Sequence, residues 1–368
     1  MLASRCRRAI LVAVALLGAP GCRDAPRVAA SVEAPVAEPG LQRLPGGWIE
    51  SRREVYGRIP ARLRFRVPAT AEAGALASEC WAEIQRLGGI FNAFDPASET
   101  GRVNAAADTR PVPVSREMSA VVATAARVHA ASGGAFDPTL WPVKRLWQDA
   151  VRRQRVPTAA EIQAALGPTG LARVRLIPGD PPSLGRDVPG LQLDFGGIAK
   201  GYAVDQVAAL LERRGTAAAL VQVGGEIQAW GVSDVGPWRV GVQHPAERGR
   251  LYGVVEHRGR VRLSTSGDYQ QPLRIGGATF AHVFDPHTGQ PVTTRVRGVT
   301  VAAFDGGPDN ATLDAVATAM TVLGAVKGRA LAARLGAEAL VIEGEPPAYA
   351  ETITAGFAAR WRRDPAAR

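Results

Sequence analysis

Apolar residues recur along this chain with two different periods. Spacings of three and four residues predict helices, and these fall at 69–87, 115–132, 199–214, 309–323 and 327–335. Alternating or short continuous apolar runs predict strands, and these fall at 59–67, 174–177, 191–195, 218–223, 226–230, 238–243, 252–256, 261–264, 282–284, 297–303 and 339–342. Neighbouring strands with helices between groups of strands are typical of α+β proteins. We therefore expect one large α+β domain of mostly antiparallel sheets with flanking helices.

Several helix boundaries carry their own signals. Ser115 is a typical N-cap, and Thr158 with Glu161 forms a capping box for a short helix. Glycine pairs at 88–89 and 133–134 are expected to end the helices before them. The segments 91–104 and 132–147 are expected to be loops.

Composition places the chain among globular proteins, with 368 residues, 46% hydrophobic and 21% charged. The net charge of +10 raises nucleic acid as a partner. The basic residues are scattered, however, and form no dense basic helix with interleaved aromatic residues, so we expect no nucleic-acid binding. No CxxC or Cys/His metal pattern is present, and Cys80 is expected to be a small core residue without a disulfide partner.

The N-terminus has the pattern of an export signal. Basic residues precede an apolar stretch at 9–19, which is too short to span a bilayer. Ala19-Pro20-Gly21-Cys22 resembles a lipoprotein box, so we expect a signal peptide over 1–21 and a lipid on Cys22. Pro20 is unusual there, which leaves cleavage without lipidation open, and Arg7-Arg8 leaves the twin-arginine route open. Residues 22–46 are expected to be a flexible tether and 47–362 the folded domain.

The stretch 193–205, LDFGGIAKGYAVD, organises the candidate chemistry. A predicted strand, two glycines and a helix start would place free N–H groups at one point, where the helix dipole favours an anion such as a phosphate. Glycines used only for tight packing are the alternative, and for this motif alone that alternative is favoured. Farther along, Asp314 and Thr318 lie four apart on a predicted helix, so they share a face that suits Mg²⁺. The alternative is a carboxylate placed near the helix dipole and a threonine bonded back to a carbonyl.

Other segments carry weaker signals singly. They are the loop 264–269 of small hydroxyls and an acid, His282 with Asp285 in a turn, Asp137 after a helix stop, and Phe94 in a loop. The order and the residues of these motifs are close to those of ApbE-type FAD:protein FMN transferases, and the chain resembles that family over 48–344. The matching segments are Phe94–Asn104, Ser132–Thr139, Asp194–Asp205, Val223–Ile227, Ser264–Tyr269, His282–Pro291 and Asp314–Thr318. Three segments depart from the family: Tyr56-Gly57-Arg58 replaces Met-Gly-Thr, Leu140-Trp141-Pro142 replaces Val-Gly-Pro, and Glu226 stands where Asp is commoner. Trp141 is expected to reshape one wall of a flavin pocket.

The resemblance implies a function and a set of site residues. It implies Mg²⁺-dependent transfer of FMN from FAD to a threonine of an acceptor redox protein, with release of AMP. Cleavage of FAD by water and non-catalytic FAD binding are the alternatives. It implies catalytic roles for His282 and Lys200, and magnesium ligation by Asp314, Thr318 and the Ala199 carbonyl. The implied FAD contacts are Tyr56, Phe94, Asp137, Thr139, Gly197, Lys200, Asp205, Ser266, Asp268 and His282. It also implies a periplasm-facing lipoprotein held at a membrane through Cys22.

Overall fold

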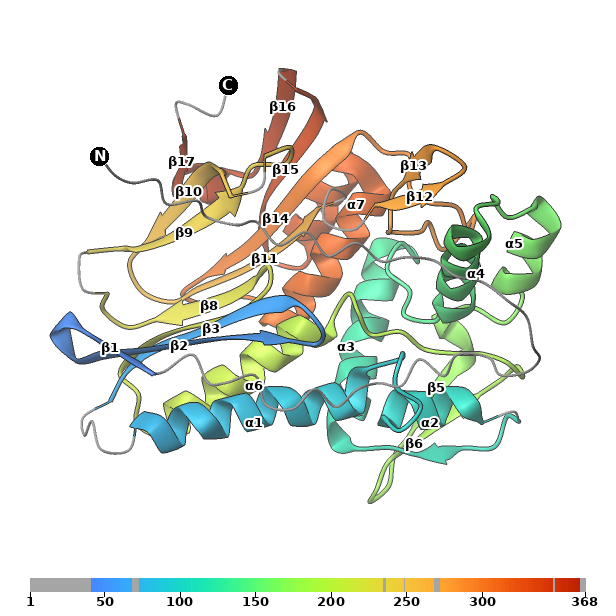
Figure 1. Cartoon of the computed structure of the whole chain (residues 1–368), viewed down its shortest axis with the longest axis horizontal. Helices are drawn as coiled ribbons and strands as arrows, with labels where there is room; N and C mark the ends of the chain where they lie inside the picture. The colour runs from blue at the N-terminus through green and yellow to red at the C-terminus, as the bar shows by residue number, and fades with distance from the viewer. Residues whose placement is uncertain are drawn as a thin grey trace, which may run out of the picture. The chain divides into compact units, whose positions relative to one another are not determined.

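A computed structural model describes residues 41–67, 73–106, 108–233, 236–247, 249–267, 272–346 and 348–364. The predicted signal peptide, Cys22 and Asp268 lie outside these residues. The described residues form a mixed α+β fold, as predicted, and its centre is a nine-stranded sheet in which all strand pairs are antiparallel (Figure 1). In spatial order its strands are β1 (Gln42–Leu44), β2 (Trp48–Val55), β3 (Ile59–Arg66), β7 (Ala218–Val223), β8 (Glu226–Trp230), β11 (Val261–Gly267), β14 (Val296–Phe304), β15 (Glu338–Glu345) and β16 (Ala348–Ile353).

The alternation within β3 shows how both faces of this sheet are covered. Leu63 and Phe65 are fully buried against helices on one face. Arg64 and Arg66 point to the other face, where both guanidinium groups lie 4.9 Å from the ring centre of Trp48. That face packs against a small sheet of β17 (Trp361–Arg363), β10 (Leu251–His257) and β9 (Trp238–Gln243).

Helices form the layer on the first face. α1 (Ala73–Phe91) and α6 (Ala199–Arg213) lie side by side over β3 and β7, and α7 (Asn310–Arg334) packs on β11, β14 and β15 (Figure 1). α3 (Arg116–Ser132) packs against α7. The remaining elements are α2 (Glu99–Ala105), α4 (Trp141–Arg153), α5 (Ala159–Leu166), α8 (Ala355–Ala358), the short strands β4 (Val112–Pro113), β5 (Val174–Ile177), β6 (Ser183–Arg186), β12 (Leu273–Ile275) and β13 (Ala278–Phe280), and the 3₁₀ turns Pro45–Gly47 and Leu171–Arg173.

The predicted break in the last long helix is confirmed. α7 contains one residue with non-helical dihedrals, Gly324 at φ 74° and ψ 178°, between the two predicted helices. Asp309 caps the first part by accepting a hydrogen bond from the N–H of Thr312 at 2.8 Å. By length and composition α7 is the one described helix that could cross a membrane, but 56% of its most apolar stretch is buried, as in a core helix.

Three predicted boundaries or strands are wrong. α1 runs through Gly88-Gly89 to Phe91, because Gly88 serves close packing: a Cβ there would lie 2.8 Å from the Tyr56 ring. Residues 191–195 form no strand; the Asn104 side chain instead donates to the Leu193 carbonyl at 2.8 Å and accepts from the Leu193 N–H at 2.7 Å. Residues 282–284 make only one bridge, between Phe284 and Pro291.

Two helices lie in the predicted loops. Ser98 caps α2 by accepting from the N–H of Gly101 at 2.9 Å. α4 begins with Pro142 in its first turn and buries Val143 and Trp147 completely. Strand β1 also lies within the predicted tether, where it pairs with β2, so the folded part begins earlier than the expected residue 47.

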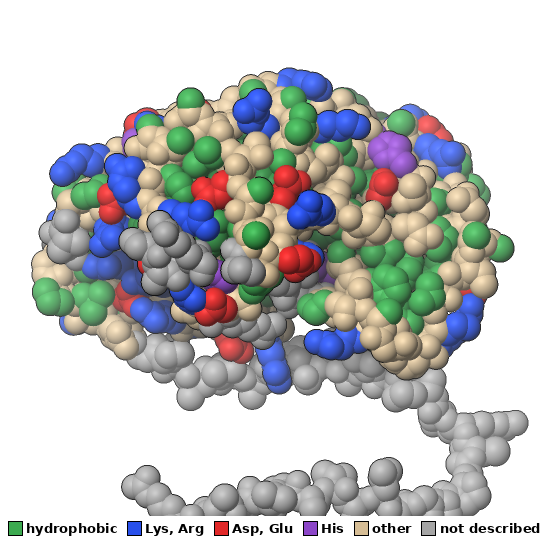
Figure 2. Space-filling view, turned by 90° about the horizontal axis from the view of Figure 1, so that it is seen from above, with side chains coloured by type: hydrophobic (Ala, Val, Ile, Leu, Met, Phe, Trp, Pro, Cys, Tyr) green, Lys and Arg blue, Asp and Glu red, His purple; other side chains and the backbone are tan. Residues whose placement is uncertain are grey.

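The surface agrees with the scattered charge of the sequence. On the face drawn in Figure 2, Lys and Arg side chains are spread out and interspersed with Asp and Glu rather than gathered into one basic groove.

Candidate functional site

A cavity of about 850 Å³ opens where the N-terminal halves of α6 and α7 meet the β7–β8 turn and the end of β11. Segments 56–60, 87–94, 135–138 and 282–286 complete its walls. Predicted site residues that line it are Tyr56, Phe94, Asp137, Gly197, Ala199, Lys200, Ser266, His282, Asp314 and Thr318. The fold therefore gathers in one place residues that are far apart in the sequence.

Two glycines allow α6 and α7 to approach each other closely. A Cβ on Gly201 would lie 2.1 Å from the Asn310 carbonyl oxygen, so only glycine fits at this crossing. A Cβ on Gly197 would lie 2.9 Å from the Thr318 hydroxyl oxygen. The glycines of the central motif thus serve tight packing, and that packing is what brings Ala199 and Lys200 beside Asp314 and Thr318.

Lys200 lies between two buried carboxylates. Its Nζ is 3.1 Å and 3.0 Å from the two Asp314 oxygens and 3.2 Å from Glu226 Oε1. Both acids are 1% exposed, and the Lys200 side chain is 24% exposed. The Gly201 N–H also donates to Asp314 Oδ2, at 3.1 Å. Asp314 is therefore held from two directions.

The electrostatics of this group reflect its burial. Burial raises the pKa of Glu226 above its usual range, the negative charge of Asp314 adds to that rise, and the positive charge of Lys200 opposes it. Burial would by itself lower the pKa of Lys200, but the two carboxylates outweigh it and leave that pKa above its usual range. Lys200 is consequently charged at neutral pH.

The oxygen groups here suit a hard cation. The Asp314 carboxylate, the Thr318 hydroxyl and Ala199 border the same cavity. These three residues offer oxygen donors and neither a histidine nitrogen nor a cysteine sulfur. Within the described part of the chain, the Thr318 hydroxyl makes no hydrogen bond; the residue that bonds back to a helix carbonyl is Thr321, which donates to the Thr318 carbonyl at 2.7 Å. The donors thus fit Mg²⁺.

An aromatic wall stands at another part of the cavity. Phe94 is 58% exposed and packs edge-on against Trp141, with ring centres 4.7 Å apart. Lys144 Nζ lies 5.2 Å from the centre of the Phe94 ring and 2.6 Å from Asp194 Oδ2. Trp141 itself is buried and does not line the cavity, so it shapes the wall through Phe94.

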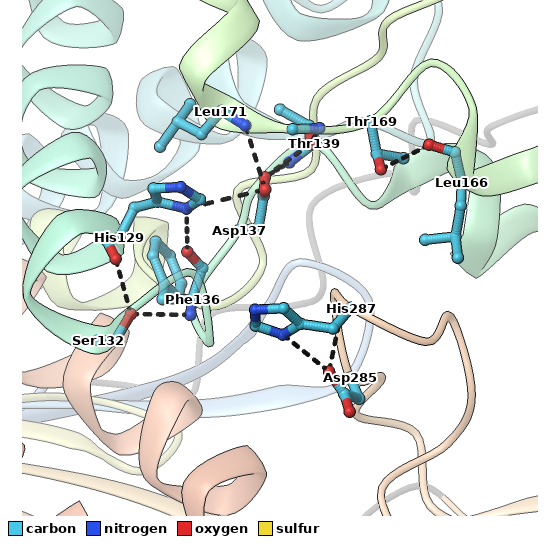
Figure 3. Close-up of polar contacts among 11 residues, drawn as sticks. His129, Ser132, Phe136, Asp137, Thr139, Leu166, Thr169, Leu171, Asp285 and His287 are labelled. Atoms are coloured by element: carbon cyan, nitrogen blue, oxygen red, sulfur yellow. Dashed lines mark hydrogen bonds and ion pairs between the residues drawn. The ribbon is translucent and has the colours of Figure 1, made fainter.

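Asp137 and Thr139 form a polar network in the loop after α3 (Figure 3). Asp137 Oδ1 accepts from the Thr139 N–H at 2.8 Å and from its hydroxyl at 2.6 Å, and Oδ2 accepts from the Leu171 N–H at 3.1 Å. Thr139 is fully buried and accepts from the Gly170 N–H at 2.7 Å. Thr139 therefore lies outside the cavity. Its hydrogen bonds to Asp137 hold in place the loop from which Asp137 borders the cavity.

Asp205 is likewise placed away from the cavity. Its Oδ1 accepts from the Asn310 N–H at 3.0 Å and from Asn310 Nδ2 at 2.9 Å, and its Oδ2 accepts from the Ala311 N–H at 2.9 Å. These bonds cap the start of α7. Asp285 similarly accepts from the His287 N–H at 2.9 Å and builds the turn after His282, as expected.

Three residues at the site escaped the sequence prediction. The sequence marks Glu226 only as a departure from a family pattern and assigns Lys144 and Asp194 no role. The alternation of β8 could not reveal Glu226, because every residue of that strand is buried. Lys144 lies on helix α4, in a segment for which the sequence predicts a loop.

A buried carboxylate, a hydroxyl, a lysine and a glycine turn border one large cavity, and groups of these kinds suit a phosphate and a divalent cation. The ApbE family model matches residues 59–341. A Klebsiella pneumoniae protein named FAD:protein FMN transferase is 35% identical over 75% of this chain and 79% of its own length. A Salmonella typhimurium protein of the same name is 32% identical over 92% and 93%. This chain belongs to the ApbE family.

Solved structures of ApbE proteins are similar to this chain. The flavinyl transferase ApbE of Pseudomonas stutzeri superposes with a TM-score of 0.72 at 31% identity, covering 84% of this chain and 96% of that one. The ApbE protein of Thermotoga maritima gives a TM-score of 0.75 at 26% identity, covering 86% and 100%.

Proposed function

We propose that this protein is an FAD:protein FMN transferase, which moves FMN from FAD to a threonine hydroxyl of an acceptor redox protein and depends on Mg²⁺. The observation that carries the proposal is the convergence of Asp314, Thr318, Ala199 and Lys200 on one wall of a cavity large enough for a dinucleotide. The names of the relatives at 35% and 32% identity support the reaction.

The proposed reaction is substitution at phosphorus. The threonine oxygen forms a bond to the FMN phosphorus, the bond from that phosphorus to the bridging oxygen breaks, and AMP leaves with that oxygen. Mg²⁺ on Asp314, Thr318 and the Ala199 carbonyl would neutralise diphosphate charge. Lys200 adds a positive charge beside the same position. His282, which lines the cavity, is our candidate to take the proton of the threonine hydroxyl.

Other cavity residues are proposed to hold FAD. Phe94 and Tyr56 offer aromatic faces to the flavin, while Gly197 and Ser266 offer backbone and hydroxyl groups to the phosphates and ribose. Asp137 borders the same cavity and is proposed to contact FAD there. Asp205 and Thr139 are left out of this set because of their positions.

The reaction is tested by mixing the purified protein with FAD, Mg²⁺ and candidate acceptors that carry a threonine. In-gel flavin fluorescence of the acceptor, lost with a chelator and with a Thr→Ala acceptor, is the expected result. Free FMN and AMP with an unlabelled acceptor would instead indicate an FAD pyrophosphatase. Tight FAD retention without any AMP would indicate a binding protein, and either result would refute the proposal.

Asp314→Asn keeps the shape of the side chain and removes its charge. We expect flavinylation to fall by at least about 100-fold, because the charged oxygen donor of the cation site is lost. Asp309→Asn is the matched control: it changes an exposed acid at the start of the same helix to an equally good N-cap. Full Mg²⁺-dependent flavinylation by Asp314→Asn would contradict the ligand assignment.

We also propose that the protein is exported and faces the periplasm, anchored in a membrane by a lipid on Cys22. The N-terminal pattern of arginines, apolar stretch and cysteine supports this. Cell fractionation with radiolabelled palmitate tests it: the label and the membrane association should both be lost in Cys22→Ser. A Cys22→Ser protein that remains in the membrane fraction would contradict the anchor.

A further inference from the structure

The most unusual contact in the cavity is that of Lys200 with the proposed magnesium ligand. Both oxygens of Asp314 lie within 3.1 Å of the ammonium group. A divalent cation on Asp314 would need the same oxygens. In a buried site, two positive charges a few ångströms apart repel strongly. Occupation of Asp314 by a cation and by Lys200 is therefore competitive.

The surroundings specify which residue moves. Asp314 is also bound by the backbone N–H of Gly201 at 3.1 Å, so its carboxylate stays in place when the ammonium leaves. Lys200 has a flexible four-carbon stem. Among the described residues, its only other acidic neighbour is Glu226, whose Oε1 lies 3.2 Å from Nζ. A small movement of the ammonium toward Glu226 frees Asp314 without leaving Lys200 unpaired in a buried site.

We propose that Lys200 is the internal counter-ion of Asp314, and that Glu226 is a positioning residue that retains Lys200 when a divalent cation takes its place on Asp314. This inference rests on the proposed function, which makes Asp314 a magnesium ligand. It gives Glu226 a role through Lys200 rather than as a ligand itself. It also leaves the ammonium in the cavity, where the diphosphate of FAD is proposed to bind.

The test is a double-mutant cycle on magnesium binding. Mg²⁺ alone is titrated into the full chain without FAD or acceptor, by calorimetry, for the parent, Glu226→Gln, Lys200→Met and the double variant. We expect Lys200→Met to bind Mg²⁺ about tenfold more tightly, because the competing charge is gone, a change within the usual range of coupling between sites. Glu226→Gln should bind about five- to tenfold more weakly than the parent, since Lys200 then has no second carboxylate. In the Lys200→Met background, Glu226→Gln should change the affinity by less than about twofold.

Each other outcome overturns the proposal. An equal loss of affinity in both backgrounds means that Glu226 acts on the cation directly. No loss in either background means that Glu226 does not retain Lys200. Unchanged or weaker binding in Lys200→Met means that Lys200 does not compete with the cation, and this last outcome decides the matter even where Glu226→Gln fails to fold.

Two further measurements keep the interpretation clear. Glu226→Asp retains a carboxylate and should bind Mg²⁺ within about threefold of the parent, whereas a role of Glu226 in packing alone predicts no such rescue. Asp314→Asn should lose Mg²⁺ binding; if it does not, the ligand assignment fails along with this inference. A parent protein that binds Mg²⁺ as expected but does not flavinylate any acceptor leaves this inference standing and refutes only the proposed reaction.

Discussion

Asn104 bonds the backbone of the segment just before the glycine turn, where strand hydrogen bonds are absent. Substituting Asn104 is therefore a sharp test of what holds this segment in place. Its side-chain amide bonds both the N–H and the carbonyl of Leu193, at 2.7 Å and 2.8 Å. Asn104→Leu keeps a side chain of similar size but makes neither bond. Both backbone groups of Leu193 would then be buried without a partner, because Asn104 is only 8% exposed and Leu193 is fully buried.

The size of the effect follows from these two bonds. A buried donor or acceptor left without a partner costs about 1–3 kcal/mol, so the two together give about 2–6 kcal/mol. An unfolding entropy of about 2.1 cal/mol/K per residue over roughly 320 folded residues gives about 0.7 kcal/mol per degree. The midpoint of thermal unfolding should therefore fall by about 3–9 °C.

Calorimetric or circular-dichroism melts measure the midpoint, and hydrogen exchange of a peptide covering 191–197 reports on the segment itself. Asn92→Leu is a stability control, because Asn92 is an exposed asparagine whose Oδ1 accepts from the N–H of Phe94 at 3.0 Å; it should cost less than about 1 kcal/mol. An Asn104→Leu protein with the parent's melting midpoint and unchanged exchange at 191–197 would refute the reasoning.

Three further substitutions probe the cavity and the start of α7. Gly197→Ala should raise the Mg²⁺ concentration needed for half-maximal flavinylation by about tenfold, because its Cβ would lie 2.9 Å from the Thr318 hydroxyl oxygen; unchanged Mg²⁺ dependence would contradict the contact. Phe94→Ala should weaken FAD binding, measured by fluorescence quenching, by about five- to tenfold at an unchanged melting midpoint, since the ring is 58% exposed; a lowered midpoint would point to a structural role. Burial raises the pKa of Asp205 to about 6, from about 4 in an unfolded chain, so the folded state binds the proton more tightly. Asp205 thus contributes stability that is complete below about pH 4 and lost as the pH rises through about 6; urea midpoints should show this fall in the parent relative to Asp205→Asn, and parallel pH curves would contradict it.

Local signals in the sequence were enough for much of the fold. The strands at 218–223 and 238–243 lie at the predicted residues, and the caps at Ser115 and Thr158 form as predicted. The failures share a cause. Leu191, Leu193 and Phe195 are apolar because they are buried, and burial alone does not distinguish a strand from a segment whose backbone is bonded by a distant side chain.

The site was predictable only as far as each signal lay within one segment. Asp314 and Thr318 share a helix face, and this is visible in a spacing of four. The group of Lys200, Asp314 and Glu226 joins three segments, and its geometry depends on how closely α6 and α7 pack. For Asp205, a motif supplied the residue but not its environment, which the structure places at the start of a helix.

Gly324 divides α7 into two helical segments, and the direction in which the second segment's side chains point does not follow from the first. In an uninterrupted α-helix, one inserted residue turns everything beyond it by about 100°. Because the helical dihedrals are interrupted at Gly324, the face presented after it is set by its own packing rather than by the phase of the turns before it. Chain length and composition can therefore vary in the second part while Asp314 and Thr318 keep their orientation toward the cavity.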